Sequence, residues 1–191
     1  LRGLRGTARG AAGAVAEAVA RRHVVLVGLP GSGKTTVGRL AAERLGASFS
    51  DLDEAIAARA GKSVARIFAE DGEPAFRALE AEAGDSLLAG EPVVLSPGGG
   101  FIEDTQRRRH ILGRALVIYL ATSPTVAAER LRGETARPLL ALGDPVTRIS
   151  ELLDRRRAGY QQAHATVTTD EQTPDDVAAA VAELARTKGG W

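Results

Sequence analysis

The sequence predicts an α/β protein with three layers, in which a parallel sheet of about five strands lies between two layers of helices. Short β-branched runs alternate with longer segments whose apolar residues recur at helical spacing. The first run, residues 24–27, is apolar on both faces, as is typical of a strand buried in a parallel sheet. The chain has 191 residues, a length that fits one such domain.

Each element follows from a local pattern. The predicted strands are residues 24–27, 47–50, 92–96, 115–120 and 166–168. The predicted helices are residues 35–45, 53–60, 63–88 with a break near Gly72, 107–113, 124–132, 145–163 and 174–187. Gly46 follows the first helix, where a helix end favours a residue that tolerates positive φ. Pro124 lies in the first turn of its helix, a position that suits proline.

The composition narrows the classes of function. The 25 Lys and Arg residues balance the 24 Asp and Glu residues, so nothing in the net charge of +1 favours a nucleic acid or a membrane surface as partner. The absence of cysteine excludes disulfides and zinc–thiolate sites. No apolar run approaches the ~20 residues that span a bilayer. We therefore expect a soluble, cytoplasmic protein of a single domain, and a monomer.

The two ends of the chain differ from the rest. Residues 1–22 consist mainly of Arg, Gly and Ala, and Glu17 is their one acidic residue. A disordered or partly helical tail is expected there, and an Arg-rich transit segment is the alternative, although the glycines would weaken its helix. The compact domain is predicted over residues 23–187. Residues 188–191 form a C-terminal tail on which Trp191 is expected to be exposed to solvent.

A phosphate-binding loop is the most specific motif. Residues 28–35 read Gly-Leu-Pro-Gly-Ser-Gly-Lys-Thr and match G-x-x-x-x-G-K-[ST] between a strand and a helix. Its glycines let backbone N–H groups turn toward an anion, and the helix N-terminus adds its positive end. Lys34 can reach the β- and γ-phosphates, and Thr35 can offer its hydroxyl to Mg²⁺. The expected nucleotide-binding residues here are Gly31, Ser32, Gly33, Lys34, Thr35 and Thr36.

Acidic residues follow the second predicted strand. Asp51 and Asp53 lie at the carboxyl edge of the sheet, where open α/β folds bind ligands. Two acids spaced in this way point to opposite sides, so one can face a metal ion and the other a substrate hydroxyl. The alternative is that one of them only caps the next helix.

Further candidates are basic or glycine-rich. Arg77 and Glu80 have a spacing that, on a helix surface, usually gives a weak solvated contact, but the arginine fork also suits a carboxylate. Gly98, Gly99 and Gly100 follow the third strand and would let bare backbone approach a ligand closely. A plain flexible loop would give the same pattern.

Taken together, six motifs resemble the shikimate kinase family over residues 23–184. They are the loop 28–35, Asp51-x-Asp53, the F-x-x-x-G-E-x-x-F-R run that ends at Arg77, the triple glycine, Arg137-Pro-Leu-Leu and Arg156-x-x-x-Tyr160. The resemblance implies an adenylate-kinase-like P-loop NTPase fold with a mobile lid at about residues 131–144. It also implies ATP as co-substrate, Mg²⁺ as cofactor, and phosphorylation of the 3-hydroxyl of shikimate in aromatic amino-acid biosynthesis.

The resemblance further implies a role for each residue. Shikimate would be held by Asp53, Arg77, Gly98, Gly99, Gly100 and Arg156. Mg²⁺ would be surrounded by Thr35 and, through water, by Asp51 and Ser96. Adenine would lie between Arg130 and Pro174, while Arg137 would reach the transferring phosphate from the lid. Lys34, Asp53 and Arg137 are then the catalytic residues.

Some features leave alternatives open. The usual proline near Tyr160 is replaced by Ala158, which leaves the choice among Arg155, Arg156 and Arg157 open. Phe101 follows the triple glycine, where a small residue is commoner, and could narrow the pocket. Pro174 could instead be only a helix-start proline.

Other side chains are expected to be structural. Phe68 and Phe76 are expected in the core or in the pocket wall, and His23, His110 and His164 are expected to be structural or on the surface. Two rival functions remain, a gluconate kinase and a ligand sensor without catalysis. The first does not account for Arg77 and Arg156 beside the triple glycine. The second would be favoured had Lys34, Asp53 or Arg137 been replaced, and none of them has been.

Overall fold

The computed structural model describes residues 20–132 and 144–191, and the fold below refers to these residues. The strands are β1 (His23–Val27), β2 (Ser48–Asp51), β3 (Val93–Ser96), β4 (Ala115–Ala121) and β5 (Ala165–Thr168). The helices are α1 (Lys34–Leu45), α2 (Leu52–Ala60), α3 (Val64–Glu70), α4 (Gly72–Leu88), α5 (Thr105–Arg114), α6 (Pro124–Arg130), α7 (Pro145–Tyr160) and α8 (Pro174–Lys188). A 3₁₀ turn, η1 (Gly99–Ile102), follows β3.

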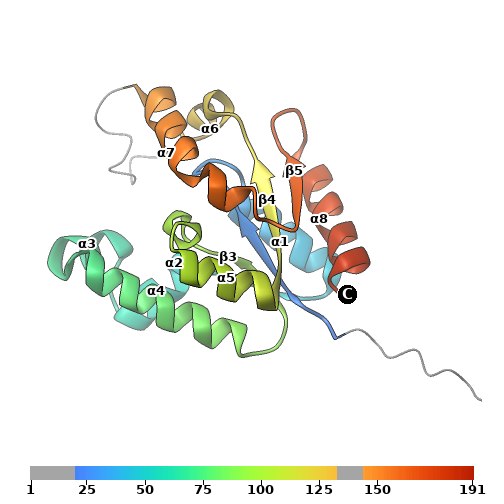
Figure 1. Cartoon of the computed structure of the whole chain (residues 1–191), viewed down its shortest axis with the longest axis horizontal. Coiled ribbons are helices and arrows are strands. Elements are labelled where there is room, and N and C mark those ends of the chain that lie inside the picture. The colour runs from blue at the N-terminus through green and yellow to red at the C-terminus, as the bar shows by residue number, and fades with distance from the viewer. Residues whose placement is uncertain (1–19, 133–143) are drawn as a thin grey trace, which may run out of the picture.

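The five strands form one parallel sheet in the order β2-β3-β1-β4-β5, which confirms the predicted fold class. Helices α1 and α8 cover one face, and the other helices cover the opposite face (Figure 1). Alternate residues of β1 therefore enter different cores. Val25 and Val27 pack under α2 to α7, whereas Val24 and Leu26 pack under α1 and α8.

The sheet topology gathers the candidate residues at one edge. Strand β1 lies between β3 and β4 in the middle of the sheet. The chain first adds β2 and β3 on one side of β1 and then β4 and β5 on the other side. The loop after β1 therefore lies at the point where the strand order reverses, which is where open α/β sheets bind ligands. Asp51 at the end of β2 is in register with Ser96 at the end of β3. The phosphate-binding loop, the acidic pair and the triple glycine consequently leave neighbouring strands at the same edge.

Local chemistry sets the helix boundaries. Gly72 has a φ of 80° and separates α3 from α4, which confirms the predicted break. Helix α5 begins at Thr105 rather than at residue 107 because the Asp104 carboxylate accepts a hydrogen bond from the Arg107 N–H at 2.8 Å. None of the helices in the described parts of the chain is long and apolar enough to cross a membrane.

The last residues of the chain pack against the start of β1, so the expectation of an exposed Trp191 is wrong. The Arg22 N–H donates to the Gly189 carbonyl at 2.9 Å, and the Trp191 indole N–H donates to the Arg22 carbonyl at 2.9 Å. The Trp191 ring is half-buried against the core under α1 and α8, and the Arg21 guanidinium lies 5.2 Å from the ring centroid. We call this set of contacts the terminal clasp.

Two histidines serve the sheet, as expected. The backbone N–H groups of Val93 and Val117 donate to Nδ1 of His23 and His164, at 3.3 and 3.0 Å respectively. Burial lowers the pKa of both imidazoles below the ordinary histidine value. Each ring is therefore held in its neutral form, with Nδ1 as the acceptor.

This arrangement predicts a loss of stability in mild acid. Because the pKa values of these histidines are lowered in the folded state, the unfolded chain binds more protons than the folded chain in mild acid. The contribution of the neutral histidines to the free energy of unfolding is therefore present above about pH 6.5 and is lost as the pH falls below that value. We expect the urea concentration at the midpoint of unfolding to decrease when the pH is lowered from about 7.5 to about 5.5. His23→Asn, whose amide oxygen can accept the Val93 N–H without titrating, should make that decrease smaller, since His23 is 7% exposed. The same substitution at the exposed His110 provides the control, and an unchanged pH dependence in His23→Asn would refute the prediction.

Candidate nucleotide and substrate site

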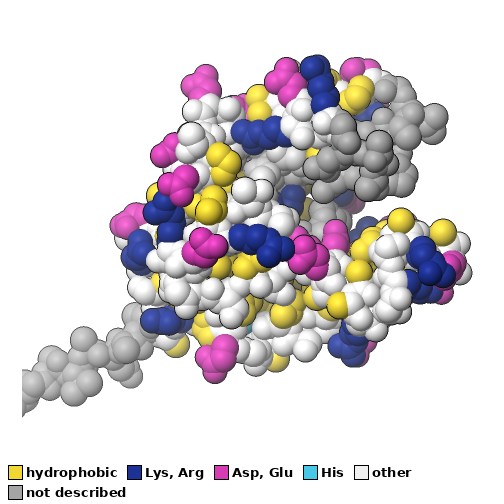
Figure 2. Space-filling model, turned by 180° about the vertical axis from the view of Figure 1, so that it is seen from behind, with side chains coloured by type: hydrophobic (Ala, Val, Ile, Leu, Met, Phe, Trp, Pro, Cys, Tyr) yellow, Lys and Arg dark blue, Asp and Glu magenta, His cyan; other side chains and the backbone are white. Residues whose placement is uncertain are grey.

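A cleft of about 390 Å³ opens at the carboxyl edge of the sheet. It is lined by residues of the phosphate-binding loop and by others from β2, the β3–η1 turn, α6 and the start of α8. The surface of the molecule is visibly hollowed, with basic and acidic side chains around the hollow (Figure 2). The predicted site residues that line the cleft are Gly31, Ser32, Gly33, Lys34, Thr35, Thr36, Asp51, Asp53, Ser96, Gly98, Gly99, Arg130 and Pro174.

The phosphate-binding loop depends on its glycines. Gly31 and Gly33 have φ values of 79° and 86°, which residues other than glycine rarely adopt. In addition, a Cβ atom on Gly31 would lie 2.6 Å from the Ala127 carbonyl oxygen. Nζ of Lys34 donates to the carbonyl oxygens of Gly28 and Leu29, at 3.0 and 2.8 Å. The ammonium is thus held across the loop at the N-terminus of α1, where an anion is favoured.

Asp51 caps the next helix, which the sequence left open as an alternative, and it also contacts the phosphate-binding loop. One carboxylate oxygen accepts from the backbone N–H groups of Asp53 and Glu54 and so caps α2, while the other accepts from the Thr35 hydroxyl at 2.9 Å. Ser96, in register with Asp51 and buried, also lines the cleft. These donors are all oxygen atoms, the ligands that Mg²⁺ prefers, and Mg²⁺ needs few from protein because phosphates and water supply the rest. The residues present therefore fit a magnesium ion.

The triple glycine brings three distant side chains together. A Cβ atom on the first glycine would lie 2.8 Å from Oδ1 of Asp53, on the second 2.5 Å from Nη1 of Arg156, and on the third 2.5 Å from Nη1 of Arg77. Those side chains come from α2, α7 and α4, and each of them meets bare backbone at the start of η1 or at the residue before it. A side chain at any of residues 98–100 would displace one of them. The triple glycine is therefore not a plain flexible loop.

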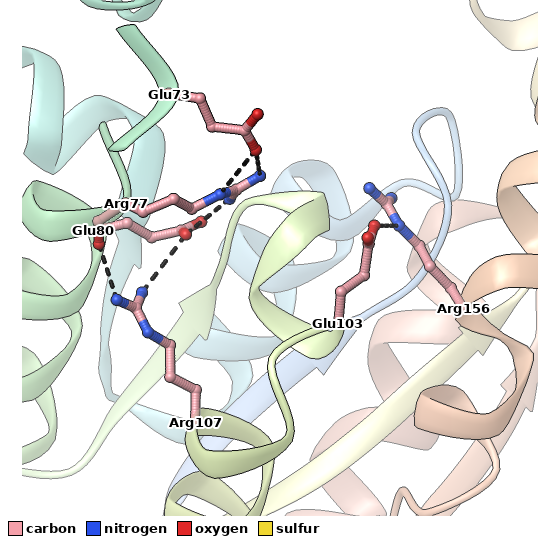
Figure 3. A network of polar contacts seen from close by, with 6 residues as sticks. All are labelled: Glu73, Arg77, Glu80, Glu103, Arg107 and Arg156. Carbon is pink, nitrogen blue, oxygen red and sulfur yellow. Dashed lines mark hydrogen bonds and ion pairs between the residues drawn. The ribbon is translucent and has the colours of Figure 1, made fainter. Parts of the chain in front are cut away.

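Arg77 lies in a network of charges (Figure 3). Its Nη1 donates to Oε2 of Glu80 at 2.8 Å, and its Nε and Nη2 donate to Oε1 of Glu73 at 3.3 and 3.1 Å. The expectation of a weak solvated Arg77–Glu80 contact is wrong, because Glu80 is only 1% exposed. Burial raises the pKa of Glu80, while Arg77 and Arg107 oppose that rise.

Two partners of Arg77, namely Arg107 and Glu73, were not predicted from the sequence. Arg107 on α5 donates to the Arg77 carbonyl oxygen at 2.8 Å and lies 3.5 Å from Oε2 of Glu80. Glu73 lies one helical turn before Arg77, and this spacing is a signal that could have identified it. No local pattern marks Arg107, because it reaches the network from another helix.

Among the three consecutive arginines of α7, Arg156 is the one beside the triple glycine. It is 8% exposed, whereas Arg155 and Arg157 lie on the exposed side and Arg157 pairs with Asp154. Its Nε donates to Oε1 of Glu103 at 2.5 Å. Within the described residues its Nη1 is buried and has no hydrogen-bond partner. This geometry favours Arg156 as the residue that meets a ligand.

Arg130 and Pro174 border the same cleft beyond the phosphate-binding loop. Arg130 is fixed by Thr169, whose hydroxyl and carbonyl oxygens accept from Nη1 and Nη2 at 3.0 and 2.6 Å. Pro174 is also the first residue of α8, where Thr173 provides the cap. It is therefore a helix-start proline and a lining residue at once.

The predicted aromatic residues are found in different surroundings, and the predicted lid is largely outside the described residues. Phe101, which the sequence left open as a residue that could narrow the pocket, is buried beside Gly84 and is not among the residues that line the cleft. Phe76 is buried as expected, but Phe68, which packs on it with 4.5 Å between ring centroids, is 41% exposed. Arg137 and most of the predicted lid lie outside the described residues.

Comparison with known proteins identifies the family. The family model described as shikimate kinase matches residues 30–186. A shikimate kinase of Thermobifida fusca is 49% identical over 164 residues, which cover 85% of this chain and 94% of that protein. The structure of a shikimate kinase from Acinetobacter baumannii in complex with shikimate matches with a TM-score of 0.82 and 34% identity, covering 87% of this chain and 94% of that one.

A gluconokinase from Sinorhizobium meliloti shares the fold, with a TM-score of 0.61 and 23% identity, and covers 87% of this chain and 95% of its own. At this identity the likeness concerns the fold alone. The family model and the T. fusca relative, by contrast, extend over most of the chain. The chain therefore belongs to the shikimate kinase family, and the ATP-dependent phosphorylation of shikimate that its motifs predict is confirmed.

Proposed function

We propose that the cleft binds ATP over the phosphate-binding loop and shikimate over the triple glycine, and that Lys34, Asp53 and Arg137 serve the transfer between them. The observation that carries this proposal is the meeting of Asp53, Arg77 and Arg156 at three successive glycines. Shikimate has one carboxylate and three hydroxyls, so it calls for arginine forks and an acidic acceptor together. These are the groups around residues 98–100.

The nucleotide end follows the same logic. The backbone N–H groups of residues 31–36 and the Lys34 ammonium would hold the β- and γ-phosphates, and Arg130 and Pro174 would enclose the adenine. Thr35 would bind Mg²⁺ directly, with Asp51 and Ser96 bound through water. When bound, Mg²⁺ offsets the negative charge that develops on the phosphate oxygens.

In the reaction, the 3-hydroxyl oxygen of shikimate attacks the γ-phosphorus of ATP. The bond from that phosphorus to the β–γ bridging oxygen breaks, and ADP leaves with the electron pair. The carboxylate of Asp53, which lines the cleft beside Gly98, would accept the hydroxyl proton. Lys34 would offset charge on the ADP side, and Arg137, which lies outside the described residues, is proposed for the acceptor side.

One assay separates this proposal from its rivals. We expect ADP release, measured by a coupled assay, to require shikimate and to exceed the rate with gluconate by ~10²-fold or more. Gluconate also has a carboxylate and hydroxyls, but its open chain does not present them in the fixed arrangement of the shikimate ring, so some of the polar groups of the site would stay unpaired. A preference for gluconate would favour a gluconate kinase. ADP release that no acceptor stimulates, with shikimate binding retained, would favour the non-catalytic sensor. The cytoplasmic location, the monomeric state and the domain boundaries stay predictions from the sequence.

A further inference from the structure

The contact between Glu103 and Arg156 has no part in the roles assigned so far. Glu103 follows η1 directly, and its backbone N–H donates to the Gly100 carbonyl oxygen at 3.0 Å. Its carboxylate is therefore carried by the same turn as the triple glycine. Its Oε1 accepts from Nε of Arg156, and neither Glu103 nor Arg156 is among the residues that line the cleft (Figure 3).

The contact divides the donors of the guanidinium. Nε donates to Oε1 of Glu103 at 2.5 Å, whereas Nη1 lies against Gly99 and completes no hydrogen bond among the residues described, although the buried Tyr160 hydroxyl lies near the guanidinium. An arginine bound through Nε keeps its end-on fork of Nη1 and Nη2 for a planar anion. A buried donor without a partner costs free energy, which an oxygen atom of a ligand would recover.

The ion pair is poorly suited to a purely stabilising role. The Glu103 side chain is 43% exposed and that of Arg156 is 9% exposed, so solvent screens the pair on the Glu103 side and reduces its contribution to folding. Its negative charge also opposes the attraction of Arg156 for an anionic substrate. A carboxylate at this position is therefore useful only if the orientation it gives to the fork outweighs that electrostatic cost.

We propose that Glu103 is a positioning residue for substrate binding, which fixes the Arg156 fork toward the carboxylate of shikimate through its hydrogen bond to Nε. The inference rests on the proposed function, because it assumes that Arg156 meets that carboxylate. It assigns to Glu103 an effect on substrate affinity and none on the reacting atoms. The favourable part of that effect comes from the hydrogen bond to Nε and not from the charge of the carboxylate.

Matched variants test this inference. Glu103→Gln keeps an oxygen acceptor for Nε and removes the charge, whereas Glu103→Asp keeps the charge and withdraws the oxygen by one methylene. We expect Glu103→Asp and Glu103→Ala to raise the KM for shikimate by about fivefold to tenfold, as for one charged hydrogen bond. We expect Glu103→Gln to stay within about twofold of the wild type, and kcat and the KM for ATP to change by less than about twofold in all three.

A second ligand distinguishes orientation from general damage to the turn. Methyl shikimate lacks the carboxylate charge, so its Kd should be nearly the same in wild type and Glu103→Asp. Glu151→Ala, at an exposed position of α7, is the control and should leave the KM for shikimate unchanged. Urea unfolding of each variant shows that the protein is folded.

The outcomes are separable from those of the proposed function. If the wild type does not phosphorylate shikimate, the proposed function fails before Glu103 is tested. If it does, an unchanged or lowered KM in Glu103→Asp overturns the positioning role. Equal defects in Glu103→Gln and Glu103→Asp also overturn it, since the charge would then matter. An equal loss of affinity for methyl shikimate would assign Glu103 to the structure of the turn.

Discussion

Asp53→Asn should lower the rate of phosphoryl transfer by ~10²–10⁴-fold, the usual cost of losing a general base. The substitution keeps the shape of the side chain beside Gly98 but removes the proton acceptor for the attacking hydroxyl. Since Thr35 meets Asp51 rather than Asp53, ATP binding should change little. Stopped-flow or coupled assays give the rate, and calorimetry with ATP and with shikimate gives the two affinities.

Asp51→Asn is the matched comparison for this prediction. It removes charge from the residue that meets Thr35, so its main effect should be on the dependence of the rate on Mg²⁺. A large loss of ATP affinity in Asp53→Asn, with shikimate binding intact, would instead place Asp53 at the metal. The roles of the two aspartates would then be reversed.

Lys34→Ala should reduce phosphoryl transfer by ~10²-fold or more while the protein stays folded, because contacts to charge that develops in the transition state typically contribute this much. The contacts of the ammonium include hydrogen bonds to the loop carbonyl oxygens of Gly28 and Leu29. Single-turnover kinetics provides the rate, and circular dichroism checks the fold.

Lys62→Ala is the control for a lost lysine on the surface. Its ammonium pairs with Glu70 and Asp71, away from the cleft, and its removal should leave turnover within about twofold of the wild type. If Lys34→Ala retained more than about a tenth of wild-type turnover, the assignment of the phosphate-binding loop would be wrong.

The fold could be predicted because its signals are local. Residues 24–27 are apolar on both faces because α1 and α8 cover one side and the other helices cover the second. Gly72 marks the helix break through its own backbone conformation. The motif of residues 28–35 needs only the strand before it and the helix after it. Each of these features is encoded within a few residues of the place where it acts.

The substrate side of the cleft could be predicted only in part, because its contacts are not local. The sequence indicated Arg77, Arg156 and the triple glycine separately, and only the packing of α4, α7 and η1 brings them together. The burial of Glu80 follows in the same way from its place in the core side of α4, facing Arg107 of α5. The residue pattern of one helix does not indicate which side chains of a second helix will pack against it.

The terminal clasp has a consequence for the connectivity of the chain. The first described residues and the last ones are joined by backbone and indole hydrogen bonds, so a short peptide linker could join residue 191 to residue 20 without moving β1 or α8. New ends could then lie between Gly90 and Glu91, exposed residues between α4 and β3, at the edge of the sheet remote from the cleft. In such a circular permutant, the triple glycine and the phosphate-binding loop would lie in reversed order along the chain. The site depends on where the strands end in space. The order of those strands along the chain can therefore be changed without changing the site.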